Sequence, residues 1–380
     1  MTRLMISAGE ASGDIHAAAA LQALSEQGHA VECFGMGGSA LEAQGMELVV
    51  DNRDLSVIGF VDVLRNYGKF KRRLETLRQR MREEKPALLL TVDYPDFNLK
   101  LAETARELDV PVLHYVSPQV WAWREGRITR IGSLVTHMAV LFPFEVPYYE
   151  RHNIPVTYVG HPLLDEIHDE FSSEEARERL GIKADNCYIG LMPGSRPSEL
   201  TRILPTLLKS AELLLEKNPH LQFLLPLAPS LDATALEPFP ELKSLPVKVV
   251  KDDSHVVAKA CDAIAVASGT ATLELALLGR PMVVVYKLNP INYAIMRRLI
   301  KIPHISLVNI VAGREVCKEL VQAAATPRAV STELHQLLDD NDYRQTQIAG
   351  LQEIKDQMGE PGASGRVAKI ILDLLHANRN

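Results

Sequence analysis

Residues 4–28 read LMISAGEASGDIHAAAALQALSEQG, and this stretch decides the fold class. The apolar run at 4–7 predicts a strand, and 9–14 predicts a turn of small and acidic residues. A helical pattern follows over 15–27, and Gly28 suits the position just past its carboxyl end. A strand, a turn and a helix in this order predict one βα unit of a parallel sheet.

The same alternation continues along the chain. Apolar runs near 31, 88, 112 and 140 are separated by helical patterns, and a second series begins near 188. Between the two series, the polar segment after His161 breaks the strand rhythm and predicts a linker. We therefore expect an α/β protein of two tandem, Rossmann-like, doubly wound domains, 1–165 and 166–359. Their ligands are expected in a cleft at the carboxyl ends of the strands.

Composition excludes several classes of protein. The chain has 380 residues, more than one core normally organises, and 41 basic against 48 acidic residues give a net charge of -7. A general electrostatic affinity for nucleic acid is therefore not expected. The apolar run near the amino terminus is too short for the apolar region of a signal sequence, and no apolar run in the chain is as long as a membrane span. We therefore expect a cytosolic protein. Four widely spaced cysteines argue against a zinc ribbon or a disulfide framework: Cys33, Cys187, Cys261 and Cys317.

Two loops in the second half have the composition of phosphate sites. ASGTATLE at 267–274 reads as a strand end, a turn and a helix start, where backbone N–H groups suit a diphosphate and Glu274 suits ribose hydroxyls. MPGSR at 192–196 offers a tight turn at Gly194 and the planar cation of Arg196. The alternatives are plain helix caps at Ser268 and Thr270 and a solvated arginine. Neither loop is a P-loop, and Gly35 to Gly38 does not fit a dinucleotide fingerprint.

Acidic residues follow two strands of the first half. Asp93 comes directly after the strand at 88–92, where a carboxylate can act as a general base. A turn cap is the alternative, although Asp96, beyond the proline, is better placed to cap the next helix. Glu10 and Ser12 lie in the other strand-end loop and suit the recognition of hydroxyls.

Aromatic residues gather after the strand near 112. Both tryptophans, Trp121 and Trp123, lie in the motif WAW, where their rings offer an apolar surface to a sugar or acyl group. Core packing is the commoner fate of a tryptophan, and lone histidines such as His161 are more often structural than catalytic.

The segment 56–85 combines apolar and basic residues in an otherwise acidic chain. Between 65 and 85 it holds nine basic residues and three glutamates, and an apolar run precedes them. This composition predicts contact with an anionic membrane surface, whereas a solvated crossover helix is the alternative. The expected membrane contacts are Val57, Ile58, Phe60, Val61, Leu64, Arg65, Arg72 and Arg73.

An ordered set of motifs over nearly the whole chain closely resembles the lipid-A-disaccharide synthase family. The motifs are GEASGD, DYPDFN, HYVSPQVWAWR, LFPFE, VGHPL, MPGSR, ASGTATLE and SLVNIVAGREV. The resemblance implies a metal-independent, inverting glycosyltransferase of GT-B architecture that needs no cofactor. It would transfer 2,3-diacylglucosamine from UDP-2,3-diacylglucosamine to 2,3-diacylglucosamine 1-phosphate (lipid X), forming a β-1,6-linked disaccharide 1-phosphate and UDP. This is a step of lipid A and lipopolysaccharide biosynthesis at the cytoplasmic face of the inner membrane.

The resemblance also assigns roles to residues. Asp93 would be the base, with Glu10 as a second catalytic carboxylate. The acceptor would contact Ser12, Asn98 and Trp123, and the carboxyl-terminal helix, about 360–380, would cross back to the first domain. The expected UDP-binding residues are Ser195, Arg196, Ser268, Gly269, Thr270, Glu274, Tyr286, Asn309 and Arg314. The motifs depart from the family at Ala11 and Val308, where Thr and Pro are common, and a homodimer is compatible with the resemblance.

Two other functions remain alternatives at this point. A UDP-sugar enzyme of the same build, such as a non-hydrolysing epimerase, would need no acyl-chain surface. A lipid or nucleotide sensor would bind its ligand without turnover. Product analysis with donor and acceptor distinguishes all three.

Overall fold

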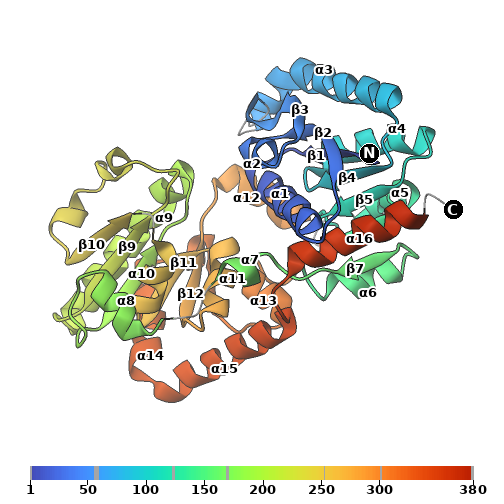
Figure 1. The fold of residues 1–380 in the computed structure, drawn as a ribbon. Helices are drawn as coiled ribbons and strands as arrows, with labels where there is room; N and C mark the ends of the chain where they lie inside the picture. Colours follow the sequence, from blue (N-terminus) through green and yellow to red (C-terminus); the bar gives the residue numbers. More distant parts are fainter. Residues whose placement is uncertain are drawn as a thin grey trace. The chain divides into compact units, whose positions relative to one another are not determined.

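The computed structural model describes residues 2–54, 60–121, 125–167, 171–251, 253–299 and 302–377. The chain divides into two compact units, each an α/β structure built on a parallel sheet (Figure 1). Unit 1 comprises Met1–Asp165 and Glu360–Asn380, and unit 2 comprises Glu166–Gly359. The prediction of two Rossmann-like α/β domains is confirmed.

Unit 1 holds a sheet of seven parallel strands in the order β3-β2-β1-β4-β5-β6-β7. The strands are β1 (Thr2–Ala8), β2 (Val31–Gly37), β3 (Glu47–Asp51), β4 (Leu88–Val92), β5 (Val112–Tyr115), β6 (His137–Val140) and β7 (Val156–Tyr158). The chain builds the sheet outward from β1 in one direction and then from β4 in the other. The carboxyl ends of β1 and β4 therefore flank the switch point, where open α/β sheets bind their ligands.

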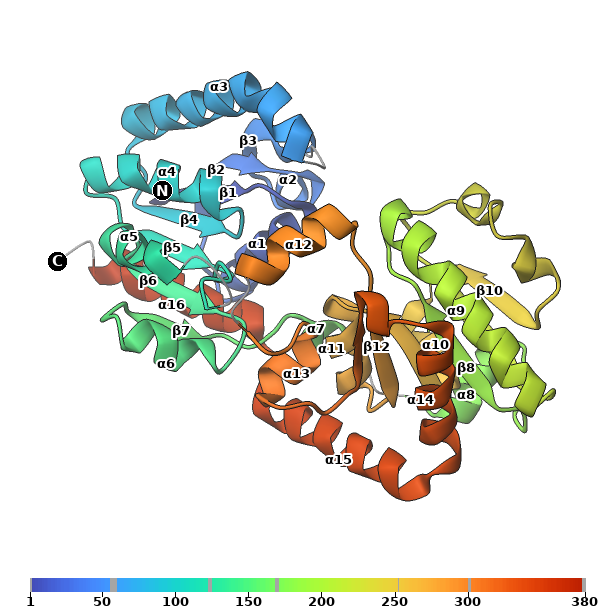
Figure 2. The ribbon, with the colours of Figure 1, turned by 180° about the vertical axis from the view of Figure 1, so that it is seen from behind.

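Helices cover both faces of this sheet. They are α1 (Ala11–Glu26), α2 (Ser39–Ala43), α3 (Phe60–Glu84), α4 (Pro95–Glu107), α5 (Ile128–Leu134), α6 (Glu145–Glu150), α7 (Leu163–Glu166) and α16 (Ala363–Ala377), with 3-10 turns η1 (Asn52–Asp54) and η2 (Glu125–Arg127). Side chains alternate along β4, so that Leu88 and Leu90 pack with α1 and α16 while Leu89 packs with α3 and α4. The two layers lie on opposite sides of the sheet in Figures 1 and 2.

The carboxyl-terminal helix α16 belongs to unit 1 because it packs against α1 and β4. Its start is fixed by Asp165, whose carboxylate accepts hydrogen bonds from the backbone N–H groups of Gly362 and Ala363. Arg366 Nε donates to the Val159 carbonyl at 2.6 Å, which ties the helix to the end of β7.

Unit 2 holds a sheet of six parallel strands in the order β10-β9-β8-β11-β12-β13. The strands are β8 (Tyr188–Met192), β9 (Gln222–Leu227), β10 (Val247–Lys251), β11 (Ala263–Ala267), β12 (Met282–Tyr286) and β13 (Glu319–Val321). The switch point lies between β8 and β11, which are the strands that precede the two predicted phosphate loops.

In unit 2, α9 and α14 cover one face of the sheet with a continuous apolar core. The helices of the unit are α8 (Ser173–Arg179), α9 (Pro197–Lys217), α10 (Ser254–Ala260), α11 (Thr270–Leu277), α12 (Pro290–Leu299), α13 (Leu307–Ala312), α14 (Pro327–Asp339) and α15 (Asn341–Met358), with 3-10 turns η3 (Ala233–Leu236), η4 (Pro240–Lys243) and η5 (Gln322–Ala324).

Candidate active site

The turn after β4 holds Asp93 in a strained backbone conformation. Asp93 and Tyr94 have φ values of 47° and 46°, in the left-handed region that residues other than glycine seldom adopt. The buried side chain of Asn98 stabilises this turn. Its Nδ2 donates to the Asp93 carbonyl at 2.7 Å and to the Val92 carbonyl at 3.2 Å, and its Oδ1 accepts from Ser7 Oγ at 2.6 Å. Strain maintained by surrounding contacts is common at functional sites.

Asn98 was expected to contact the acceptor. Its side chain is fully buried and hydrogen-bonded within the protein. The expected contact with the acceptor stays a prediction, whereas the contact with the Asp93 turn is present in the structure.

The loop after β1 lies against the Asp93 turn. A Cβ atom on Gly9 would lie 2.3 Å from Tyr94 Cδ1, so the absence of a side chain lets the two loops pack together. Glu10 is exposed directly after Gly9, and Ser12 is exposed in the first turn of α1. The neighbouring Asp14 is buried instead, and it accepts backbone hydrogen bonds at the start of α2.

The pKa of Asp93 is raised to about 6. Burial is the main cause and the negative charge of Glu10 is the second, whereas a hydrogen bond from the Tyr94 backbone acts in the opposite direction. A carboxylate with this pKa is ionised at neutral pH and accepts a proton more readily than an ordinary aspartate. Asp96 does not share this environment because it is exposed and forms an ion pair with Arg127.

Aromatic side chains follow β5 and β6 at the same end of the sheet. Trp121 packs edge-on against Phe144, with ring centroids 5.0 Å apart, and its Nε1 donates to the buried carboxylate of Glu145 at 3.1 Å. Burial raises the pKa of Glu145 to about 7. Trp123 lies outside the described residues.

The two nearby histidines are structural. Burial lowers the pKa of both His114 and His161 to about 4, so their rings are neutral at physiological pH. His114 Nδ1 lies 2.7 Å from Thr91 Oγ1, and His161 packs against Phe142.

In unit 2 the two predicted phosphate loops line one cavity of about 400 Å³ at the carboxyl ends of β8 and β11. Residues 192–196 form one wall of the cavity and residues 266–271 form another. The rest of its lining includes Glu274, Asp253 and the stretch 226–229. Gly194 has a φ of 109°, which favours glycine. The side chain of Arg196 is 71% exposed at the start of α9 and is therefore accessible to a ligand.

Glu199 occupies the donors of the first loop. Its Oε2 accepts from the backbone N–H groups of Ser195 and Arg196 at 3.1 and 3.2 Å, and its Oε1 lies 3.4 Å from Arg196 Nη1. A carboxylate is therefore bound by the groups that would bind a phosphate. Sequence reasoning missed Glu199, although a glutamate three residues into a helix is a typical capping signal.

The second loop ends at the amino terminus of α11. Gly269 is the residue preceding the helix, Thr270 begins it, and both are exposed. Ser268 is half-buried and its Oγ donates to the Ile305 carbonyl at 3.0 Å. The Thr272 N–H donates to the Gly269 carbonyl at 3.1 Å. The N–H groups at the very start of a helix have no acceptor one turn earlier, so this end of α11 gives the cavity a wall that favours an anion.

The remaining expected UDP ligands are not all at this cavity. Tyr286, at the end of β12, has Arg196 and Glu199 as charged neighbours but is not among the residues that line the cavity. Asn309 is fully buried, and its amide binds Cys317 and Glu319. Arg314 forms an ion pair with Glu353 on α15 and does not line the cavity. The roles of Asn309 and Arg314 as UDP ligands therefore stay predictions.

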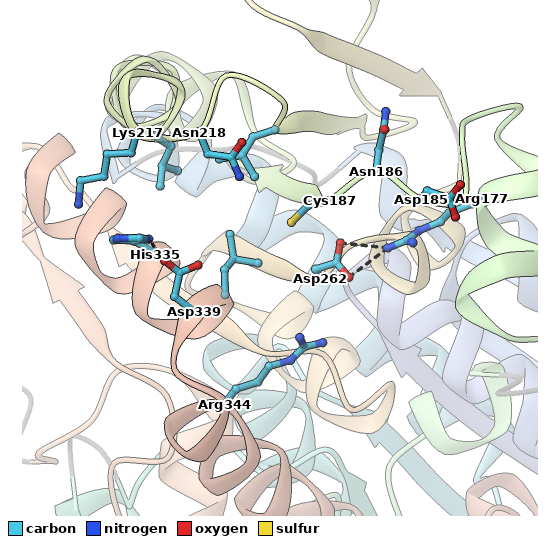
Figure 3. A pocket seen from close by; sticks show the side chains of 13 residues that line it. Arg177, Asp185, Asn186, Cys187, Lys217, Asn218, Asp262, His335, Asp339 and Arg344 are labelled. Carbon is cyan, nitrogen blue, oxygen red and sulfur yellow. Dashed lines mark hydrogen bonds and ion pairs between the residues drawn. The ribbon is translucent and has the colours of Figure 1, made fainter.

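A second cavity in unit 2, of about 550 Å³, lies at the amino ends of the strands (Figure 3). This cavity is larger, but its Arg177 is already paired with the carboxylate of Asp262. Arg177 Nη2 lies 3.0 Å from both carboxylate oxygens. We therefore place the candidate phosphate site at the cavity of the two loops.

The basic segment of unit 1 is a helix packed by one face. Leu74, Leu77 and Met81 of α3 are buried in the core, as the crossover-helix alternative requires. Arg78 and Arg80 pair with glutamates, whereas Arg72 is exposed and Arg73 half-buried. Val57 and Ile58 lie outside the described residues, as do the side chains of Phe60, Val61, Leu64 and Arg65.

Two features are absent from the residues that the structure describes. No three His, Cys, Asp or Glu side chains in this part of the chain lie in an arrangement that would hold a metal ion. None of its helices combines the length and apolar character required to cross a bilayer.

Comparisons of structure find the same fold in solved structures of other proteins. The *S. aureus* MnaA–UDP structure matches with a TM-score of 0.64 at 15% identity, covering 98% of both chains. CalG4, the calicheamicin glycosyltransferase, matches with a TM-score of 0.63 at 14% identity, covering 99% of this chain and 98% of that one. At these identities the matches show the fold alone, which is two Rossmann-like domains of the GT-B fold class.

Comparisons of sequence are more specific. The model of the family described as lipid-A-disaccharide synthetase matches residues 4–369. The lipid-A-disaccharide synthase of *Geobacter sulfurreducens* is 44% identical over 98% of this chain and 97% of its own, and that of *Nitrosococcus oceani* is 43% identical over 97% and 95%. With matches of this extent, the chain belongs to the lipid-A-disaccharide synthase family of glycosyltransferases.

Proposed function

We propose that this protein transfers the 2,3-diacylglucosaminyl group of UDP-2,3-diacylglucosamine to the 6-hydroxyl of 2,3-diacylglucosamine 1-phosphate. The observation that carries the proposal is Asp93, a carboxylate with a pKa of about 6 in a strained turn at the switch point of unit 1. Family membership supplies the substrate class, and the cavity of unit 2 offers the exposed guanidinium of Arg196 and the amino terminus of α11 to a diphosphate.

The reaction inverts the anomeric centre. Asp93 accepts the proton of the acceptor 6-hydroxyl while the oxygen of that hydroxyl forms a bond to the anomeric carbon. The bond from that carbon to the diphosphate breaks with its electron pair, and UDP leaves. Arg196 and the first turn of α11 then stabilise the negative charge that develops on the leaving phosphate.

The two units have separate tasks in this proposal. Unit 1 would bind the lipid acceptor, with Glu10 and Ser12 at the loop next to the base. The negative charge of Glu10 raises the proton affinity of Asp93, and this is the role that we propose for Glu10 in the reaction. Unit 2 would bind the UDP-sugar, with Glu274 accepting the ribose hydroxyls.

Both substrates carry acyl chains, and each buried methylene favours an apolar phase by about 0.8 kcal/mol. We therefore propose peripheral association with an anionic membrane through the amino-terminal part of α3, at the cytoplasmic face where UDP-sugars are present. The cationic side chain of Arg72 is exposed there. Substituting Val61, Leu64, Arg72 and Arg73 by Ser or Glu should weaken binding to anionic liposomes, and unchanged binding would remove this surface from the proposal. Sedimentation equilibrium would determine whether the protein is a homodimer.

Product analysis tests the proposed reaction. The protein is incubated in detergent with donor and acceptor together, and with each alone, and the products are identified by mass. We expect a disaccharide 1-phosphate and UDP only when both substrates are present. Conversion of the donor without acceptor would instead indicate an epimerase or hydrolase, and binding without any product would indicate a sensor.

A further inference from the structure

The proposed nucleotide cavity is itself acidic. One cationic side chain, Arg196, and three carboxylates, Glu199, Asp253 and Glu274, line it, so that their formal charges sum to about -2. A diphosphate brings further negative charge to the same space. Its binding is therefore opposed by the lining unless the carboxylates are neutralised or bound elsewhere.

Two of the three carboxylates have backbone partners. Glu199 accepts the N–H groups of Ser195 and Arg196 at the start of α9, and Asp253 Oδ1 accepts that of Val256 at the start of α10 at 3.2 Å. Each is therefore held at a helix amino terminus, where negative charge is favoured.

Glu274 has a different partner. It lies within α11, and its Oε2 is 3.5 Å from Nε2 of His255, which belongs to the first turn of α10. The side chain of Glu274 is 24% exposed and that of His255 is 37% exposed, so both remain close to solvent at the edge of the cavity. A protonated His255 would offset the Glu274 charge and restrict its orientation.

We propose that His255 is a positioning residue for the donor nucleotide. Its imidazolium holds the Glu274 carboxylate in place for the two ribose hydroxyls and reduces the repulsion between that carboxylate and the diphosphate. The inference rests on the proposed function, and it adds a proton-dependent contribution to donor affinity that does not involve the base.

The surroundings of His255 favour its protonated form. Its pKa is raised, first by the hydrogen bond to Glu274 and further by the charges of Glu274, Glu166 and Asp253, while partial burial opposes the rise. The protonated form is thus present below the raised pKa and is lost as pH increases through it. Donor affinity should therefore decrease as the solution becomes alkaline.

Among the described residues, the cations that approach α10 from other elements already have partners, and Arg280 donates to the Ser173 hydroxyl and to the Lys259 carbonyl. On α8, Arg177 is bound by Asp262 and Arg179 lies over the Phe171 ring. On β10, Lys248 donates to the Leu180 carbonyl and Lys251 acts on Asp232. The strands β8 and β9, which also contact α10, carry no charged residues.

The test measures donor affinity as a function of pH. Binding of UDP-2,3-diacylglucosamine in detergent is followed by calorimetry between about pH 6 and pH 8.5, where neither esterified phosphate of the donor titrates. The variants are His255→Gln, which removes the charge, and His255→Arg, which makes it permanent. His220→Gln, on an exposed loop at the other end of the strands, is the matched control.

We expect His255→Gln to weaken donor binding roughly twofold to fivefold near pH 6.5, the range of a partly exposed ion pair, and to flatten the pH dependence. His255→Arg should retain the affinity at both ends of the range, and turnover at saturating donor should change little in either variant. His220→Gln should match the unmodified protein.

Two results would overturn the inference. If the unmodified protein binds the donor with an affinity independent of pH, or if His255→Gln binds it equally well, His255 has no such role and the proposed function stands. If the unmodified protein does not bind the donor at all, both fail. The pH profile of the unmodified protein and the Arg variant keep the test decisive even if His255→Gln does not fold.

Discussion

Replacing Asp93 by Asn should abolish most activity and stabilise the protein. The substitution preserves the shape of the side chain, and asparagine tolerates the left-handed conformation of this turn. It removes both the base and a partly buried negative charge beside Glu10. A structural role for Asp93 alone would predict the opposite change in stability.

The raised pKa of Asp93 gives the size of the expected change in the free energy of unfolding. A rise from 3.8 to about 6 corresponds to an upper limit of about 3 kcal/mol, at about 1.4 kcal/mol for each pH unit. Because solvent reaches part of the side chain, we expect about 1 to 2 kcal/mol. Between pH 3.8 and about 6 the native state holds a proton on Asp93 that the unfolded state has lost. The destabilisation of the native state by the ionised carboxylate therefore grows as pH increases through this window and is complete above it.

Urea denaturation and steady-state turnover together make the test. At pH 8 the Asp93→Asn protein should have a free energy of unfolding about 1 to 2 kcal/mol above that of the unmodified protein, and the difference should vanish near pH 4. Turnover should fall by about two to four orders of magnitude while donor binding is retained. Normal turnover, or destabilisation at pH 8, would refute the reasoning.

Three further substitutions separate ligand contacts from structural support. Asn98→Ala should lower the free energy of unfolding by about 3 kcal/mol and reduce turnover, because the carbonyls of the β4 turn lose their donor; unchanged stability in urea would contradict this. Gly194→Ala should weaken UDP binding about tenfold by calorimetry, because its φ is 109° and its Cβ would lie 2.3 Å from Glu199 Oε2; normal affinity would show that the loop does not bind phosphate. Asn309→Ala should also cost about 3 kcal/mol, yet the folded variant should bind UDP normally, and weakened binding would confirm Asn309 as a ligand.

The architecture follows from patterns that are local in sequence. Strands such as 88–92 are short apolar runs, and each is followed by a turn and an amphipathic helix, so the two parallel sheets could be predicted without long-range information. The topological switch points then bring Asp93 next to Glu10 and residues 193–196 next to 268–271. Carboxyl ends of neighbouring strands must meet at one edge, so these pairings follow from strand order.

The functions of individual polar residues were harder to predict. Asparagines such as Asn98 and Asn309 often bind ligands, but here both amides are hydrogen-bonded to backbone and side-chain groups within the protein. These contacts depend on loop conformations that the sequence does not specify. His255 lies outside every motif and approaches Glu274 only because α10 and α11 are adjacent at the edge of the cavity. Burial also decides that His114 and His161 are neutral, whereas sequence gives only their identity.

The proton affinity of Asp93 is the central claim, and the pH dependence of the single-turnover rate tests it most directly. With donor and acceptor saturating, the rate of disaccharide formation should increase with pH through a midpoint near 6 and then level off, as one carboxyl loses its proton. A rate that is already maximal at pH 4.5, or one that follows a group titrating well above pH 7, would contradict the assignment of Asp93 as the base.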